Sequence, residues 1–170
     1  PVNNLVTADG VKIKGTFYEN TRVNAPTVIM LHPIGEDKSS KSREWKNLAE
    51  GLAKSGFSVL TFDFRGHGES TSIDDKTLFW SKAANSNYVK AKDKETIDVR
   101  DYIKNGASYL PVLVNDIAAA RAWLDRRNDD TKDCNTSNLM IIAADQGATL
   151  AAIWMNAEWH RFKYTPNPMF

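Results

Sequence analysis

Residues 139–148 read Leu-Met-Ile-Ile-Ala-Ala-Asp-Gln-Gly-Ala, an uncharged apolar run that meets an acidic residue where a helical pattern begins. Ala143 and Gly147 lie two positions before and two positions after Asp145. A sharp turn from a buried strand into a helix needs small residues there, because the flanking backbone and the helix come too close for larger side chains. The spacing favours such a turn with a carboxylate at its tip, although small residues are also common at ordinary strand–helix junctions.

Two further apolar runs, 27–31 and 57–62, are expected to be parallel strands covered by helices on both faces. Residues 11–18 alternate between polar and apolar, which predicts a half-buried antiparallel strand. This strand is expected to form a hairpin with a short strand that contains Leu5 and Val6. The sequence thus predicts an α/β fold with an open, mostly parallel twisted sheet that begins with an antiparallel hairpin.

Helical periodicity recurs in three segments, 42–55, 112–124 and 148–159. Ser42 is the expected N-cap of the first helix, and Gly56 is expected to end it. Since strands and helices alternate along the chain, about five strands flanked by helices are expected, joined by right-handed crossovers.

The 71–108 segment is polar and rich in lysine, and it sustains no helical or strand period. A connection of this length inside a compact domain is usually a functional excursion, such as a lid, or a surface wrap. Its main apolar anchor is Phe79 with Trp80. We therefore expect residues 1–170 to form one domain with a long excursion at 71–108.

The composition is ordinary for a globular protein, with 42% hydrophobic residues, 25% charged residues and a net charge of +1. This charge creates no strong field for nucleic acid or an anionic membrane, and no apolar run approaches the ~20 residues of a membrane helix. We therefore expect a soluble protein with no nucleic-acid and no membrane partner. Pro1 in place of a starting methionine leaves export, for example to the periplasm, open.

The residues capable of ligating metals predict no metal site and no cofactor. The single cysteine, Cys134, excludes an internal disulfide and a cysteine-based zinc site. Paired carboxylates occur at Glu36-Asp37 and at Asp74-Asp75, but no histidine cluster accompanies either pair. No G-x-G-x-x-G stretch follows the first parallel strand, which argues against a dinucleotide-binding domain.

Two further stretches each follow one of the expected strands, and both precede the 143–147 turn in the sequence. They are His32-Pro33-Ile34-Gly35 and Asp63-Phe64-Arg65-Gly66-His67-Gly68-Glu69-Ser70. Through them the chain resembles the α/β-hydrolase family, from about residue 5 to residue 159. The first stretch is similar to the family's oxyanion loop, the second to its D-x-R-G-x-G-x-S stretch, and the turn to its nucleophile elbow. Within the family, the chain is most similar to a bacterial subgroup with an acidic residue at the elbow.

The resemblance implies a role for each matching residue. Asp145 takes the position of the nucleophilic serine, and the backbone N–H groups of Ile34 and Gln146 form the oxyanion hole. Pro33 stands where the family usually has glycine. The other matching residues are structural, with Ala143 and Gly147 at the elbow and His32, Gly35, Arg65, Gly66, His67 and Gly68 in the two loops.

Asp145 allows two interpretations. As in the epoxide hydrolase and haloalkane dehalogenase branch, it could be a nucleophile whose ester intermediate is hydrolysed by a histidine-activated water. Alternatively, the chain has kept the scaffold and lost the serine. His32 and His67 precede the elbow and are expected to be structural, and His160 follows the elbow at a distance of roughly 20 Å along a helix. We therefore predict a catalytically degenerate protein, a pseudoenzyme.

The family resemblance also implies that this chain is the N-terminal part of the fold. The family continues past the elbow helix with three more strands, which this sequence lacks. Strand 139–142 would then be an open sheet edge with an apolar face, which is a typical association site. We expect a missing C-terminal half or a second protein chain to pair across it. Such a partner could supply the missing histidine, which gives the alternative of a hydrolase with an aspartate nucleophile acting on an epoxide, haloalkane or ester.

Overall fold

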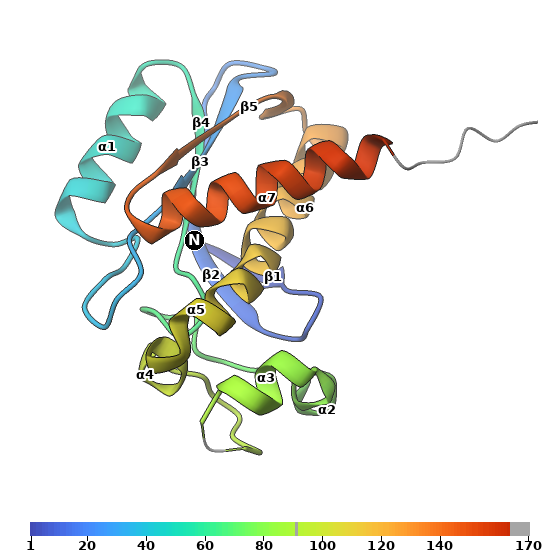
Figure 1. Cartoon of the computed structure of the whole chain (residues 1–170). Helices are drawn as coiled ribbons and strands as arrows, with labels where there is room; N and C mark the ends of the chain where they lie inside the picture. Colours follow the sequence, from blue (N-terminus) through green and yellow to red (C-terminus); the bar gives the residue numbers. More distant parts are fainter. Residues whose placement is uncertain (91, 164–170) are drawn as a thin grey trace, which may run out of the picture.

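A five-stranded sheet forms the centre of the molecule, in the part of the chain that the computed structural model describes, residues 1–90 and 92–163 (Figure 1). The strands are β1 (Val2–Val6), β2 (Lys12–Tyr18), β3 (Pro26–Leu31), β4 (Ser58–Phe62) and β5 (Asn135–Ala143). Their spatial order is β1-β2-β4-β3-β5. β2 is antiparallel to both β1 and β4, whereas β3 is parallel to both β4 and β5. The predicted α/β class and N-terminal hairpin are confirmed, and the sheet is mixed.

The burial of the two central strands follows from their sequence. All five residues of β4 are buried, as are all residues of β3 after Pro26. Strands that are apolar without alternation can be stable only where both sheet faces are covered, so these two strands take the centre. β2, which alternates, is only partly buried along most of its length.

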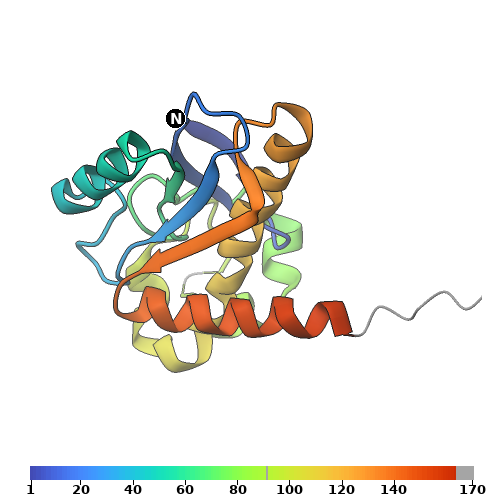
Figure 2. The same cartoon turned by 90° about the horizontal axis from the view of Figure 1, so that it is seen from above.

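Helices cover both faces of the sheet (Figures 1 and 2). α1 (Arg43–Lys54) packs Ala49 against Val28, Met30 and Val59 on one face. α6 (Val114–Asp130) and α7 (Gln146–Lys163) lie on the opposite face, within the larger hydrophobic core. The expected cap of α1 is present, since the Ser42 side chain accepts a hydrogen bond from the Trp45 N–H.

The segment between β4 and α6 contains several short helices. They are α2 (Lys76–Ser81), α3 (Ala83–Tyr88), α4 (Val99–Tyr102), the 3₁₀ turns η1 (Ile103–Asn105) and η2 (Leu110–Leu113), and α5 (Gly106–Tyr109). Three aromatic side chains of this segment, Phe79, Tyr102 and Tyr109, are completely buried. The segment therefore contributes to the core, whereas the sequence suggested a lid or a surface wrap. Helices of four to six residues are too short to produce the apolar period that identifies a helix in sequence.

A buried ion cluster connects this segment to the sheet. The Arg65 guanidinium, 0% exposed, donates to Asp9 on one side and to Asp116 of α6 on the other, at 2.6–2.9 Å. The Asn85 amide of α3 also donates to Asp9, and the Tyr109 hydroxyl donates to Asn85. Burial alone would raise the pKa of Asp9, but the hydrogen bonds and charge of Arg65 outweigh it and lower this pKa to about 2. The cluster thus joins the Arg65 loop to four other parts of the chain, which are the β1–β2 turn, α3, α5 and α6.

We predict that replacing Arg65 with methionine destabilises the protein strongly. The substitution leaves Asp9 and Asp116 buried without a cation, and breaking a buried charge cluster in this way costs about 3–5 kcal/mol. The free energy of unfolding, measured by urea titration, should fall by that amount. Arg100→Met is the control, because Arg100 pairs with Asp98 at the surface. Similar unfolding midpoints for the two variants would show that the cluster is not a main support of the fold.

Candidate functional site

The turn between β5 and α7 has the backbone geometry of a strained strand–helix junction. β5 ends at Ala143, α7 begins at Gln146, and Asp145 lies between them with φ = 48°. This left-handed conformation is unfavourable for most residues with a side chain, although aspartate adopts it more readily than most. Asp145 is exposed, and the turn therefore presents its carboxylate at the carboxyl end of the sheet, just before the first turn of α7.

Gly147 is required by the contact between α7 and β3. A Cβ atom at this position would lie 2.8 Å from the His32 carbonyl oxygen and 3.0 Å from that of Leu31. Ala143 is the register partner of Leu31 in the β3–β5 pair, so the elbow follows directly from that strand pairing. The two small residues therefore lie where the sequence pattern required them.

Ile34 and Gln146 lie at the same edge of the sheet. Each follows the end of one of two neighbouring strands, β3 and β5, by three residues. Within residues 1–90 and 92–163, the backbone N–H groups of Ile34 and Gln146 have no hydrogen-bond partner. The next amide, that of Gly35, donates to His67 and is thus not available. Ile34 and Gln146 are thus two residues at this edge whose N–H groups remain without a partner among the described residues.

The His32 and His67 side chains are both held by backbone groups. The Nε2 atom of His32 accepts the Phe64 N–H at 3.1 Å, and its Nδ1 atom lies 2.6 Å from the Pro33 carbonyl oxygen. The Nε2 atom of His67 accepts the Gly35 N–H at 3.2 Å, and its Nδ1 atom lies 3.1 Å from the Arg65 carbonyl oxygen. This pattern needs neutral rings that carry the proton on Nδ1.

Burial keeps both imidazoles neutral. It lowers the pKa of His32 to about 4, with a further contribution from the neighbouring His67 ring. It also lowers the pKa of His67 below its ordinary value, although the nearby Arg65 and Phe64 backbone groups and the carboxylate of Asp63 oppose the shift. At neutral pH neither ring carries a charge into this buried region.

The glycines of the 63–70 loop give Asp63 and the neighbouring segment room to pack. Gly68 has φ = 49°, and a Cβ atom there would collide with the Asp63 carboxylate. Gly66 has φ = 79°, and a Cβ atom would lie 2.6 Å from the Val99 nitrogen. The Asp63 carboxylate accepts hydrogen bonds from the Ser39 hydroxyl and from the Ser40 N–H. The sequence suggested that this stretch is structural without revealing Asp63 as the residue that holds the 32–40 loop.

His160 lies in the last part of α7, well beyond the elbow. Its side chain is exposed, and its Nδ1 atom is 2.8 Å from the carbonyl oxygen of Asn156 in the preceding turn. Among the described residues, no group of three or more histidine, cysteine, aspartate or glutamate side chains is arranged to hold a metal ion. The site therefore consists of one carboxylate, two amide donors and two backbone-bound imidazoles.

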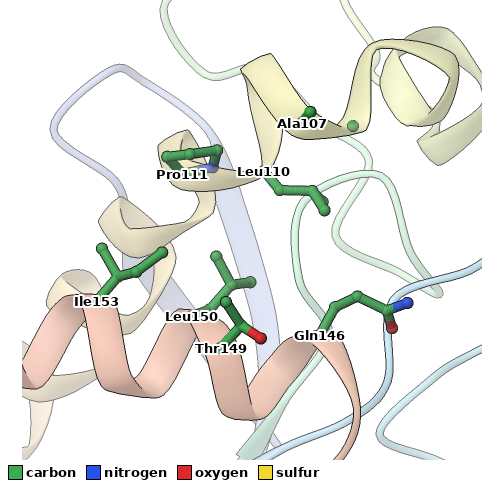
Figure 3. Close-up of a pocket in the computed structure, with 8 residues that line it drawn as sticks. Ala107, Leu110, Pro111, Gln146, Thr149, Leu150 and Ile153 are labelled. Carbon is green, nitrogen blue, oxygen red and sulfur yellow. The ribbon is translucent and has the colours of Figure 1, made fainter.

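A mainly apolar cavity of about 240 Å³ lies beside the elbow (Figure 3). Leu110 and Pro111 of η2 line one side, and Gln146, Thr149 and Ile153 of α7 line the other. Gln146 therefore belongs both to the elbow and to the cavity wall. A small apolar group bound in the cavity would lie next to the elbow.

The comparisons with known proteins identify the family. The family model for the α/β hydrolase fold matches residues 26–155. This match contains the sheet strands β3, β4 and β5, the elbow and most of α7. The chain therefore belongs to the α/β hydrolase fold family.

Solved structures agree with this fold. DcsB, solved in complex with its substrate analogue, is 20% identical with a TM-score of 0.58, and the match covers 91% of this chain and 40% of DcsB. A putative α/β hydrolase from Agrobacterium tumefaciens is 18% identical with a TM-score of 0.56, covering 89% of this chain and 52% of that one. An esterase from Pyrococcus furiosus is 25% identical with a TM-score of 0.53, covering 88% and 43%.

The chain spans about half the length of these structures or less. No curated protein sequence matches it. In the part of the chain that is described, no helix has both the length and the apolar character needed to cross a bilayer. These comparisons establish the fold and the family.

We predict opposite effects for two glycine-to-alanine substitutions. Gly147→Ala introduces a Cβ atom against the backbone of β3 and should lower the free energy of unfolding by about 1–3 kcal/mol. Gly51→Ala is the matched control, because the space around Gly51 in α1 is open. It should raise the free energy of unfolding by about 0.5–1 kcal/mol, through the better helix propensity of alanine. Equal effects in thermal or urea unfolding would contradict the close packing at the elbow.

Proposed function

We propose that this chain is a catalytically degenerate α/β-hydrolase module that binds a ligand at the elbow and does not hydrolyse it. The observation that carries the proposal is the state of the two imidazoles near the elbow. Each uses one ring nitrogen to accept a backbone N–H, and the other lies against a backbone carbonyl. A general base needs a ring nitrogen that is free to take a proton from water.

The position of Asp145 supports the same conclusion. A carboxylate nucleophile forms an ester that must be hydrolysed, and without a base the protein would remain acylated or alkylated after one turnover. His160 lies at the other end of α7 and contacts Asn156. The described residues therefore offer no base for the second half of the reaction, even if Asp145 can attack.

A binding role is supported by the groups that remain available. The amides of Ile34 and Gln146 can donate to an oxygen atom, and the adjacent cavity is lined mainly by apolar side chains. Together they suit a small molecule with an apolar part and a polar oxygen, which is the chemical class we propose as ligand. The Asp145 carboxylate would disfavour an anionic head group beside it.

The proposal predicts no turnover that depends on Asp145. Ester, epoxide and haloalkane substrates should be converted at the same background rate by the wild-type protein and by Asp145→Asn, which keeps a side chain tolerant of left-handed backbone. Asp37→Asn, at an exposed carboxylate outside the elbow, serves as control. A rate that is lost in Asp145→Asn and kept in Asp37→Asn would refute the degenerate module.

The geometry of the elbow favours a second candidate, a hydrolase with Asp145 as nucleophile that is completed by a C-terminal part or by a partner chain. The left-handed backbone of Asp145 is costly, and such strain is commonly kept at functional sites. The completing part would pair with β5, which is one of the two edge strands of the sheet. β5 has nine residues, none of them charged, and Met140 is 41% exposed. Edges without charges or proline readily pair with other strands.

Association through this edge predicts self-association of the isolated chain. Light scattering coupled to size exclusion should detect species larger than a monomer for the wild type, and Met140→Lys should shift the distribution towards the monomer, because a charge opposes strand pairing. Val23→Lys is the control, since Val23 is exposed in a loop before β3. A well-folded wild-type monomer at all concentrations would argue against an associating edge.

A further inference from the structure

His32 and His67 connect two loops reciprocally. His32 belongs to the 32–40 loop and accepts the N–H of Phe64 in the 63–70 loop. His67 belongs to the 63–70 loop and accepts the N–H of Gly35 in the 32–40 loop. The two rings are in edge-to-face contact, with centroids 5.1 Å apart. Each loop is therefore held by an imidazole from the other.

From this arrangement we propose an acid-sensitive latch, in which protonation of His67 and then of His32 releases residues 35–38 while the sheet stays folded. The evidence for the latch does not depend on the proposed binding function. It concerns the loop that carries the Ile34 amide, so opening would change the elbow region.

The chemistry of the latch follows from the ring nitrogens. A neutral imidazole has one acceptor nitrogen, and an imidazolium has none. When His67 takes a proton from solvent on Nε2, its new N–H points at the Gly35 N–H, which is 3.2 Å away in the closed state. Two donors cannot bond to each other, so the contact changes from attractive to repulsive. The same change at His32 would release Phe64.

Charged groups around the rings set the order of protonation. The Asp63 carboxylate favours the protonated form of both rings, and Asp98 at the start of α4 favours that of His67. Burial opposes protonation of both, and the neighbouring His67 ring opposes that of His32.

Two nearby cations are already paired. Arg65 is bound between Asp9 and Asp116, and Arg100 pairs with Asp98. Glu36 lies on the same cleft as Asp98 and Arg100, at the surface. His67, which has the additional carboxylate, should therefore protonate first.

The released segment is bounded on both sides by contacts that do not involve histidine. On one side, Leu31 pairs with Phe62 and with Ala143 in the sheet. On the other, Ser39 and Ser40 are bonded to the Asp63 carboxylate. Between these anchors, Glu36, Asp37 and Lys38 are exposed. Ile34 is buried in the core, so loss of the Gly35 contact frees only the short segment after it, without breaking a strand pair.

The test is amide hydrogen exchange followed by NMR at steps from about pH 7 down to about pH 4, because burial lowers the pKa of both rings below the usual histidine range. The measured quantity is the protection factor of the Gly35 amide divided by that of the Leu60 amide in β4, each corrected for the intrinsic exchange rate. This ratio should fall about tenfold at the lowest pH, as expected for the loss of one hydrogen bond. In His67→Gln, whose amide does not titrate, this ratio should not change with pH. His160→Gln is the matched control and should behave as the wild type.

A constant ratio in the wild type would overturn the latch, as would an equal fall in His67→Gln. If His67→Gln does not fold, the wild-type protein provides a second readout. The Gly35 amide shift and the His67 ring carbon shift should then titrate with one midpoint. A Gly35 shift without an inflection at the His67 midpoint would also overturn the proposal.

Discussion

The fold depends on one buried cation placed between two carboxylates. Arg65 follows the end of β4, and its guanidinium contacts Asp9 from the β1–β2 hairpin and Asp116 from α6. Moving these three groups out of water is costly, and the cost is offset only because nearly every donor and acceptor is satisfied. Asn85 completes the shell of Asp9, and the Tyr102 hydroxyl binds the Arg65 carbonyl. The cluster thereby fixes the 63–70 loop, which in turn supports the loop beside the elbow.

Much of the framework could be predicted from sequence because its signals are local. An uninterrupted apolar run such as 27–31 has few alternatives to a central strand. The start of α1 was predictable from Ser42, a single capping residue. The need for a small residue at position 147 was predictable from sterics, and the structure adds the reason, which is the close approach of α7 to the carbonyl oxygens of Leu31 and His32.

The rest could not be predicted because it depends on contacts between distant residues. Asp116 lies in a helix whose polar residues look like a solvated face, and only the fold brings it to Arg65 at 2.7 Å. The short helices of the 71–108 region are held by caps such as that of Asp75 and by buried aromatics, and neither leaves a period in the sequence. His32 and His67 each bind the loop that carries the other. This arrangement could not be predicted, because no sequence pattern shows that the two loops face each other.

The left-handed backbone at residue 145 lies between the end of β5 and a glycine with no room for a side chain, and both constrain its conformation. This backbone position therefore suits a short polar side chain and holds it in a fixed orientation. Serine, cysteine and asparagine are all small enough to occupy such a place. A single substitution at residue 145 can thus change the reactive group, whereas assembling the other catalytic residues would require substitutions at many positions. Lineages that gain or lose chemistry on this scaffold can do so while their architecture stays the same.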